Sequence, residues 1–413
     1  MAQERLQAVY DQLRGSNLPS LKAKNPHDVV ITAARRTPLC KAVKGQFKDT
    51  SSDELLLSLF QAIKSNIGID PALIGDICVG TVLTKDANYS ARSAALAAGF
   101  PESVPIQVIN RFCSSGLMAI TTIANQIRNS EIEVGLAVGF ESMTANPDIG
   151  PSGKCDEIMA HPAANDCFQP MGWTSENVAR DFSISRTAMD EAAATSHQRA
   201  EAAQRSGHFG NEIMAIEAYS RNSDGSRAKI RVTQDDGIRI GTTAESLGKV
   251  RAAFPQWPPA NTTGGNASQL TDGGAFVLLM TRRKAEELNV PILAKHIATS
   301  VAGLAPRIMG IGPIYAIPKV LERCGLQKSE VDLWEINEAF SSMYVYCLQK
   351  LQLDHEKVNI SGGAIALGHP LGATGARQVA TGLNALKKRN GKVLVTSMCI
   401  GTGMGAAAVF VAE

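Results

Sequence analysis

Beginning at Asp28, short apolar runs alternate with segments in which apolar residues recur at every third or fourth position. The runs have the length of buried strands, and the recurring spacing is typical of amphipathic helices. Strands are predicted at residues 28–38, 74–83, 104–110 and 133–143. Helices are predicted at residues 52–68 and 90–100, and a third is predicted to start after Cys113 within the segment 111–129. This alternation predicts an α/β protein with buried strands.

The alternation stops between residues 144 and 264, a stretch rich in proline, asparagine, aspartate and glycine. Within it, residues 185–207 carry one long helical pattern. A strand-like run, GGAFVLLM, resumes the alternation at residue 273. We therefore expect residues 144–264, approximately, to form an inserted loop-and-helix domain outside the sheet.

The second part of the chain repeats the pattern of the first. One strand-like segment begins at Asp76 and another at Asp332, which is 332 − 76 = 256 positions later. Cys113 and His369 are separated by the same interval, 369 − 113 = 256, and each precedes a predicted helix. This repeat indicates a tandem duplication with an insertion in the first copy. The expected boundaries are an extension and linker at 1–27, a first half at 28–285 and a second half at 286–413.

Composition narrows the class of protein. With 413 residues, 44% of them hydrophobic and 19% charged, the chain can build a large globular core. A formal net charge of +2 gives no reason to expect nucleic acid as a partner. No apolar run reaches the length of about 18 residues that a membrane span requires. The eight cysteines form no CxxC pair, so we expect reduced intracellular thiols and no bound metal.

Cys113 and His369 are the first candidates for chemistry, because a pseudo-twofold packing of the two halves would make them face each other. His369 lies in a glycine-rich stretch, residues 361–377, with Pro370 expected in the first turn of the following helix. The positive end of a helix should lower the pKa of Cys113 towards neutrality, and a nearby histidine can take its proton. Taken singly, each residue is as readily explained as packed core. Their equivalent positions favour a nucleophile and its base.

Two further candidates follow predicted strands of the second half. Cys399 precedes a glycine-rich turn, GTGMG, whose backbone N–H groups are suited to an oxyanion hole. A dinucleotide-binding fingerprint does not fit there, because a strand follows the turn and the full GxGxxG is absent. Asn337 and Glu338 stand at the end of the strand that begins at Asp332. Such residues commonly cap a neighbouring element, but strand ends also present functional groups.

Five segments together resemble the thiolase family, in the order expected for it. They are NRFCSSGL around Cys113, GNAS at 265–268, NEAF at 337–340, GGAIALGHPLGATGAR at 362–377 and CIGTGMG at 399–405. The similarity extends from about Asp28 to Glu413. It implies a five-layered αβαβα fold built from two similar halves, with the insertion as a loop domain that binds coenzyme A (CoA).

The resemblance also implies an acyltransferase activity, the cleavage of a 3-ketoacyl-CoA by CoA. It makes Cys113 the nucleophile that carries the acyl thioester, His369 its base and Cys399 the acid and base for the departing acetyl-CoA and the incoming CoA. A water held by Asn337, together with His369, would stabilise the enolate oxygen. The backbone N–H groups of Cys113 and Gly401 would form the oxyanion hole. Glu338 is expected to support these groups rather than to react.

For CoA, a co-substrate rather than a permanently bound cofactor, the resemblance implies contacts with Met171, Arg239, Ser246 and Ser268. Solvated arginine and ordinary turn serines are the alternative interpretation of these positions. The chain departs from the common family pattern at Phe112, Ser341 and Ala252, and none of these changes removes a reacting group. We expect Phe112, which precedes the nucleophile, to narrow the acyl tunnel and so to affect the preferred chain length.

The N-terminus resembles an amino-terminal (type 2) peroxisomal targeting signal, with Arg5 and Leu6 followed by Gln12 and Leu13. A short helix without such a role is the alternative, and Glu4 and Asp11 make a mitochondrial presequence a poorer fit. The expected partners are therefore a peroxisomal import receptor and, because such duplicated folds commonly form isologous interfaces, a second copy of the chain.

The signal favours a degradative enzyme of fatty-acid β-oxidation in the peroxisome, with the mitochondrial matrix or the cytosol as alternatives. Two other functions stay open at this point. One is an acetyltransferase that forms acetoacetyl-CoA. The other is a lipid carrier with the thiolase fold and no turnover, against which the intact set of Cys113, His369 and Cys399 argues.

Overall fold

Ten strands form one hydrogen-bonded sheet with two halves of the same design in the computed structural model, which describes residues 17–413. The strands of the first half are β1 (Val29–Arg36), β3 (Asp76–Gly80), β4 (Ile106–Ile109), β5 (Val134–Ser142) and β8 (Thr271–Thr281), with β2 (Cys40–Lys41) paired to β8. Those of the second half are β9 (Ala294–Gly303), β10 (Leu333–Ile336), β11 (Val393–Ile400) and β12 (Met404–Ala412).

The strand order reproduces the duplication that the sequence predicts. The first half runs β4-β3-β5-β8-β1 and the second β10-β11-β12-β9. β3 and β5 pair in parallel, as do β10 and β11, while the remaining pairs of β5, β8 and β1 and of β11, β12 and β9 are antiparallel. The two halves meet where β1 and β9 pair at two positions, Val30 with Lys295 and Ile31 with Ala294.

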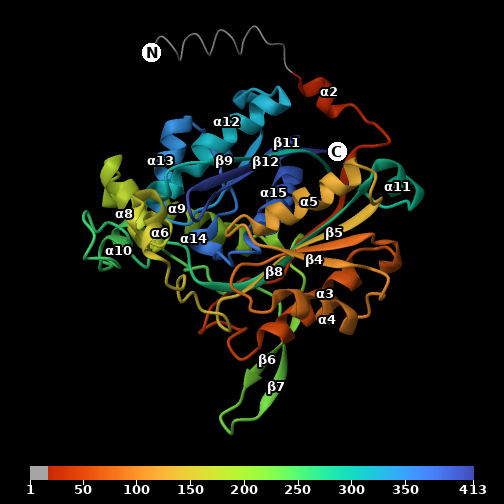
Figure 1. Ribbon diagram of the computed structural model, residues 1–413, viewed down its shortest axis with the longest axis horizontal. Coiled ribbons are helices and arrows are strands. Elements are labelled where there is room, and N and C mark those ends of the chain that lie inside the picture. The colour runs from red at the N-terminus through yellow and green to blue at the C-terminus, as the bar shows by residue number, and fades with distance from the viewer. Residues whose placement is uncertain (1–16) are drawn as a thin grey trace.

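Helices cover both faces of each half-sheet (Figure 1). The middle layer is α5 (Ser115–Arg128) and α15 (Thr374–Lys388), and one apolar core joins both helices to both half-sheets. The outer layers are α3 (Ser52–Asn66) and α4 (Ala87–Ala97) on the first half, and α12 (Gly312–Cys324) and α13 (Ser341–Leu351) on the second. The predicted five-layered αβαβα fold is thus confirmed.

Glycines allow the two central helices to approach each other at their N-terminal ends. A Cβ atom on Gly116 would lie 2.6 Å from the carbonyl oxygen of Gly372, and one on Gly375 would lie 2.3 Å from the nitrogen of Leu117. No side chain fits at these distances. Because Gly116 comes three residues after Cys113 and Gly372 three after His369, this contact brings the two candidate residues to one place.

The segment between β5 and β8 lies outside the large sheet. Its helices are α6 (Asp156–Ala160), α7 (Pro162–Asp166), α8 (Met171–Asp181), α9 (Arg186–Arg205) and α10 (Ala244–Gly248). They gather at one side of the molecule in Figure 1. The segment also contains a projecting hairpin, β6 (Ile216–Arg221) and β7 (Arg227–Val232), which the sequence pattern did not predict. The short helices α11 (Arg282–Glu287) and α14 (Ala364–Leu367) complete the fold.

The chain ahead of β1 is more ordered than the linker predicted for it. Residues Leu18–Lys22 form helix α2, whose Leu18 and Leu21 pack against the core of the second half. The side-chain amide of Asn17 donates to the carbonyl oxygen of Cys324 at 2.9 Å. The proposed targeting residues Arg5, Leu6, Gln12 and Leu13 lie outside the described residues.

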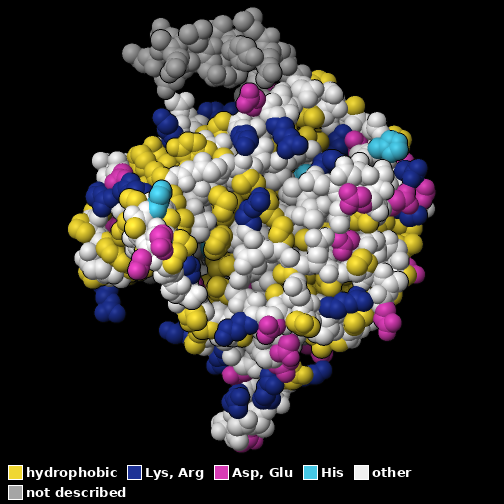
Figure 2. Space-filling view, in the orientation of Figure 1, with side chains coloured by type: hydrophobic (Ala, Val, Ile, Leu, Met, Phe, Trp, Pro, Cys, Tyr) yellow, Lys and Arg dark blue, Asp and Glu magenta, His cyan; other side chains and the backbone are white. Residues whose placement is uncertain are grey.

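None of the helices in residues 17–413 combines the length and the hydropathy of a transmembrane segment. Within the same range, no three histidine, cysteine or acidic side chains are grouped as metal ligands. Acidic and basic side chains are interspersed on the face that Figure 2 shows.

Candidate active site

His369 lies in a loop directly ahead of α15 and is held by bonds at its backbone and at both ring nitrogens. Its backbone N–H donates to Thr271 Oγ1 at 3.1 Å, and its Nδ1 lies 2.6 Å from Thr374 Oγ1. The Thr374 hydroxyl itself donates to the carbonyl oxygen of Pro370 at 3.1 Å, so it accepts the proton of Nδ1. Nε2 therefore carries the lone pair, 3.3 Å from the Asn337 side-chain nitrogen. This is the tautomer that a base acting through Nε2 requires.

The helix after His369 is α15, and Pro370 lies ahead of it. Pro370 belongs to a turn in which its carbonyl oxygen accepts from the N–H groups of Ala373 and Thr374, and α15 starts at Thr374. The prediction that Pro370 occupies the first helical turn is therefore wrong. The extra turn allows Thr374, at the start of the helix, to reach back to the His369 ring.

Cys113 lies in the turn between β4 and α5 and is 9% exposed. The residue before it, Phe112, has a left-handed backbone with φ of 47°. Opposite this turn, a Cβ atom on Gly401 would lie 3.4 Å from the Phe112 ring. The backbone N–H of Gly401 is directed at the Cys113 sulfur. The fold thus joins the end of β11 to the Cys113 turn, although the two are far apart in sequence.

The predicted acidity of Cys113 is wrong. Burial raises the pKa of its thiol to about 11, and the N–H groups of Gly401 and of Cys113 itself offset only part of that shift. Burial likewise lowers the pKa of His369 to about 3, with a further contribution from the Arg377 guanidinium. The resting pair is therefore a neutral thiol and a neutral imidazole, and the proton must move when substrate is attacked.

Cys399 is the second-last residue of the fully buried strand β11, two residues before Gly401. Burial raises the pKa of the Cys399 thiol well above its ordinary value, and the nearby Cys113 raises it further. The Cys399 Sγ lies 3.6 Å from Met343 Sδ, in an apolar cluster to which Met171 also belongs. A thiol in such surroundings keeps its proton until a strong base, such as a carbanion, reaches it.

Asn337 and Glu338 follow β10 and point in different directions. The Asn337 side-chain oxygen is buried and has no hydrogen-bond partner among residues 17–413, whereas its nitrogen faces His369. Glu338 accepts from Ser196 Oγ at 2.6 Å, Asn359 Nδ2 at 2.8 Å and the Ile365 N–H at 3.1 Å. These contacts fit the supporting role that the sequence suggests for Glu338.

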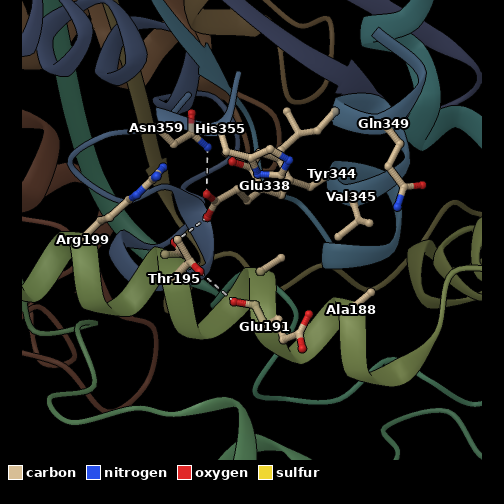
Figure 3. A pocket seen from close by; sticks show the side chains of 13 residues that line it. Ala188, Glu191, Thr195, Arg199, Glu338, Tyr344, Val345, Gln349, His355 and Asn359 are labelled. Atoms are coloured by element: carbon tan, nitrogen blue, oxygen red, sulfur yellow. Dashed lines mark hydrogen bonds between the residues drawn. The ribbon is translucent and has the colours of Figure 1, made fainter. Parts of the chain in front are cut away.

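Glu338 also forms part of the wall of a cavity of about 300 Å³ between α9 and α13 (Figure 3). The cavity is lined by side chains such as Arg199, Tyr344 and His355, and Cys113, His369 and Cys399 do not line it. We therefore do not assign the chemistry of the candidate active site to it.

The four candidate CoA contacts lie in different surroundings. Met171 begins α8 and packs in the cluster around Cys399. Arg239 donates through Nη2 to the carbonyl oxygen of Gly264 at 2.9 Å, and the Ser268 N–H donates to the Ala339 carbonyl oxygen at 3.0 Å. Ser246 is exposed in the capping turn of α10, where its hydroxyl donates to the Thr243 carbonyl oxygen. All four lie on the inserted segment or next to it.

Sequence reasoning missed two residues that hold His369, Thr271 and Thr374. Both are ordinary threonines in sequence, one at the start of β8 and one at the start of α15. For Thr374, the sequence offered one weak signal: a hydroxyl residue at a helix start, about one turn after a candidate histidine. Their role depends on a contact between β8 and the loop ahead of α15, which no local pattern encodes.

The neutral state of Cys113 leads to a pH prediction. Because the pKa of Cys113 is about 11, its alkylation by iodoacetamide should be slow at pH 8 and should accelerate about tenfold per pH unit towards pH 11. Peptide mapping of the alkylated protein measures this rate, with the exposed Cys155 as an internal reference. A Cys113 that reacts at its full rate already at pH 8 would contradict the prediction.

The site thus combines one thiol, one neutral imidazole and a second thiol beside an N–H-rich turn, at the junction of two duplicated halves. This arrangement is suited to an enzyme that forms covalent thioesters. Residues 29–283 match the family described as thiolase, N-terminal domain, and residues 290–412 match thiolase, C-terminal domain. The chain therefore belongs to the thiolase family.

Individual relatives give closer comparisons. The chain is 50% identical over 407 residues to the peroxisomal 3-ketoacyl-CoA thiolase of Yarrowia lipolytica, covering 98% of this chain and 97% of that protein. It is 46% identical to the dimeric peroxisomal thiolase of Saccharomyces cerevisiae, with a TM-score of 0.87 and coverage of 96% and 100%. For the human mitochondrial 3-ketoacyl-CoA thiolase in complex with CoA, the identity is 34%, the TM-score 0.81 and the coverage 94% and 98%.

Proposed function

We propose that this enzyme cleaves 3-ketoacyl-CoA with CoA to give acetyl-CoA and an acyl-CoA shortened by two carbons, the last step of fatty-acid β-oxidation. The observation that carries the proposal is the close approach of the N-terminal ends of α5 and α15, which follow Cys113 and His369, with the Gly401 N–H directed at the Cys113 sulfur. The high identity to 3-ketoacyl-CoA thiolases over nearly the whole chain supports the same reaction.

In the first half-reaction, His369 Nε2 takes the proton of Cys113 as the sulfur attacks the 3-keto carbon. The oxygen of the resulting tetrahedral intermediate accepts from the N–H groups of Cys113 and Gly401. The C2–C3 bond then breaks, and Cys399 donates its proton to C2 of the leaving acetyl-CoA carbanion. The raised pKa of Cys399 supports this role, because an acid for a carbanion must hold its proton until the bond breaks.

The second half-reaction uses the same groups, with proton transfer in the opposite direction. Cys399, now a thiolate, takes the proton of the incoming CoA thiol, and the CoA sulfur attacks the acyl thioester on Cys113. The shortened acyl-CoA leaves, and the proton on His369 returns to Cys113. Two thiols with separate tasks are what two half-reactions of this kind require.

Asn337 would hold a water that, with His369, stabilises the enolate oxygen of the departing acetyl-CoA. Its buried side-chain oxygen without a partner among residues 17–413 supports this role, because such an atom needs a hydrogen-bond donor. A neutral His369, fixed by Thr374, can act as base in one step and as donor in the other.

CoA would bind along the inserted segment. Arg239, half-buried beside Gly264, would meet a phosphate group, and Ser246 and Ser268 would contact the pantetheine arm or the adenine end. Met171 would pack near the reacting thioester, because it shares an apolar cluster with Cys399. The similarity to a thiolase solved in complex with CoA supports this class of co-substrate.

We place the enzyme in the peroxisome, where its relatives from yeasts are named as residing, and we expect a homodimer as in the yeast relative described as dimeric. A monomer in sedimentation at micromolar concentration would contradict the dimer. Import would proceed through a type 2 receptor that reads Arg5, Leu6, Gln12 and Leu13. Deletion of residues 1–15 should then leave an active but cytosolic enzyme, provided that no intact subunit is co-expressed.

Intact-protein mass spectrometry tests the function directly. On mixing the enzyme with 3-ketooctanoyl-CoA in the absence of free CoA, we expect a hexanoyl group on Cys113 and release of acetyl-CoA. An unmodified protein that still binds the acyl-CoA would instead support a carrier. Turnover restricted to acetoacetyl-CoA, with none on longer substrates, would support the short-chain acetyltransferase.

A further inference from the structure

Glu141 is a buried carboxylate that the reaction above does not use. It lies one residue before the end of β5 and has no exposed surface. Its Oε1 accepts from the Leu83 N–H at 3.0 Å and from Thr81 Oγ1 at 3.2 Å. Its Oε2 accepts from the Val82 N–H at 3.0 Å and from the Gly372 N–H at 2.9 Å. Burial raises the pKa of Glu141 to about 7, and the hydrogen bonds from these donors, three of them backbone N–H groups, favour the ionised carboxylate against that shift.

One of the four bonds reaches the loop that carries His369. Gly372 comes three residues after His369 and two before Thr374, whose hydroxyl fixes the His369 ring. A Cβ atom on Gly372 would lie 2.5 Å from Thr81 Cα, so the loop of the second half is inserted against the first half without space for a side chain. The bond to Glu141 fixes the loop at that contact.

The other bonds lead to the turn that carries Cys113. The carbonyl oxygen of Val82 accepts from Asn110 Nδ2 at 3.1 Å. The Asn110 Oδ1 in turn accepts from the Phe112 N–H at 3.0 Å. Phe112 adopts its left-handed conformation immediately before Cys113, so this bond supports a conformation that a bulky residue rarely adopts. Glu141 is thus connected to both reacting residues, one from each half of the duplication.

We propose that Glu141 is a positioning residue that holds the Cys113 turn and the His369 loop at their reacting separation across the junction of the two halves. The proposal rests on the proposed function for its effect on turnover. We call Glu141 with its donors at residues 81–83 and 372 the Glu141 clamp.

The charge of Glu141 indicates that its contribution is geometric rather than electrostatic. Burial is the main cause of the high pKa of Cys113, and the negative charge of Glu141 raises it further. That charge therefore opposes the thiolate and, by the same sign, the enolate that forms during the reaction. Because the charge of Glu141 opposes the reacting charges, its contribution must come from the four hydrogen bonds that it accepts.

The test compares Glu141→Gln, Glu141→Ala and a matched control. Glutamine can keep the bonds to Val82 and Gly372 through one oxygen but places an N–H group against Leu83, whereas alanine removes all four bonds. We expect kcat to fall about tenfold for Glu141→Gln and about a hundredfold for Glu141→Ala, with KM unchanged, as for a small misplacement of reacting groups. Asn110 belongs to the same chain of hydrogen bonds between Glu141 and the Cys113 turn. We therefore expect the kcat losses of Glu141→Gln and Asn110→Ala to be less than additive when the two changes are combined.

Asp76→Asn is the control. Asp76 is also a buried carboxylate of the first half-sheet, but it lies at the start of β3 and accepts from Gln107 and Gln126. It contacts neither catalytic loop, so its variant should lose stability but retain kcat per folded molecule. Unchanged kcat in both Glu141 variants, a loss confined to KM, or an equal loss in Asp76→Asn would overturn the proposal.

Amide hydrogen exchange tests the Glu141 clamp without relying on turnover. In Glu141→Gln, peptides that cover residues 80–84 and 369–374 should exchange faster than in the wild type and in Asp76→Asn. If the wild type fails to cleave 3-ketoacyl-CoA, the proposed function is wrong, and the exchange data still decide whether the clamp exists. Unchanged exchange in both segments would overturn the clamp even in an active thiolase.

Discussion

Replacing Cys113 by alanine is expected to lower kcat for thiolysis of 3-ketooctanoyl-CoA on the order of 10⁴- to 10⁶-fold, as in other enzymes that lose a covalent nucleophile. The bond from sulfur to the acyl carbon is lost with Cys113, because the proposed mechanism assigns the second thiol, Cys399, to proton transfer at the leaving carbanion. The variant should still bind acyl-CoA. Steady-state kinetics and the mass of the protein after substrate addition measure both parts of this result.

Cys324→Ala is the matched control for Cys113→Ala. Cys324 is also a buried free cysteine, but it ends α12 in the outer layer of the second half. Its variant should lose about 1 kcal/mol of stability and keep its activity. Thiolysis that persists in Cys113→Ala within tenfold of the wild type would refute Cys113 as the nucleophile. An acyl adduct mapped to Cys399 instead would reassign that role.

Replacing His369 by alanine is expected to lower the rate of Cys113 acylation about 10²- to 10⁴-fold at pH 8, the range for loss of a general base. Without the imidazole, the thiol must ionise into solvent. Since the pKa of Cys113 is about 11, the thiolate fraction at pH 8 is small and rises about tenfold per pH unit. The variant should therefore recover activity steadily as the pH is raised, whereas the wild type should not.

His296→Ala provides the comparison for His369→Ala. His296 lies in β9, is fully buried and has a pKa lowered by burial, as His369 does, but it pairs with Arg128 on α5 away from the site. Its variant should unfold at lower temperature and retain the acylation rate of the wild type. A flat pH profile in His369→Ala, or an acylation rate equal to that of the wild type, would show that another group removes the thiol proton.

Local patterns were sufficient to predict the architecture. The alternation of apolar runs and helical spacing indicates which residues face a core. Each strand and helix must bury its own apolar side chains, so this signal is present locally along the chain. The interval of 256 between Cys113 and His369 identified the duplication, and strand order in the two half-sheets confirms it. The docking of α2 depends on contacts with the distant second half, so no local pattern predicts it. The β6–β7 hairpin, with Asp224 and Gly225 in its turn, is a local pairing that the pattern of apolar residues missed.

By itself, the sequence determined the class of fold and the nature of the reaction and predicted the pairing of Cys113 with His369, because duplication and motif order are properties of the chain. Only the tertiary structure decided the ionisation of these residues and what holds them. Whether Cys113 is acidic depends on the balance between its helix end and its burial, and burial prevails. Glu141 is one carboxylate in an apolar run until folding supplies donors from residues 81–83 and 372. A buried carboxylate depends on the groups that donate to it, and for Glu141 the tertiary structure brings these from a separate turn of the first half and, at Gly372, from the second half.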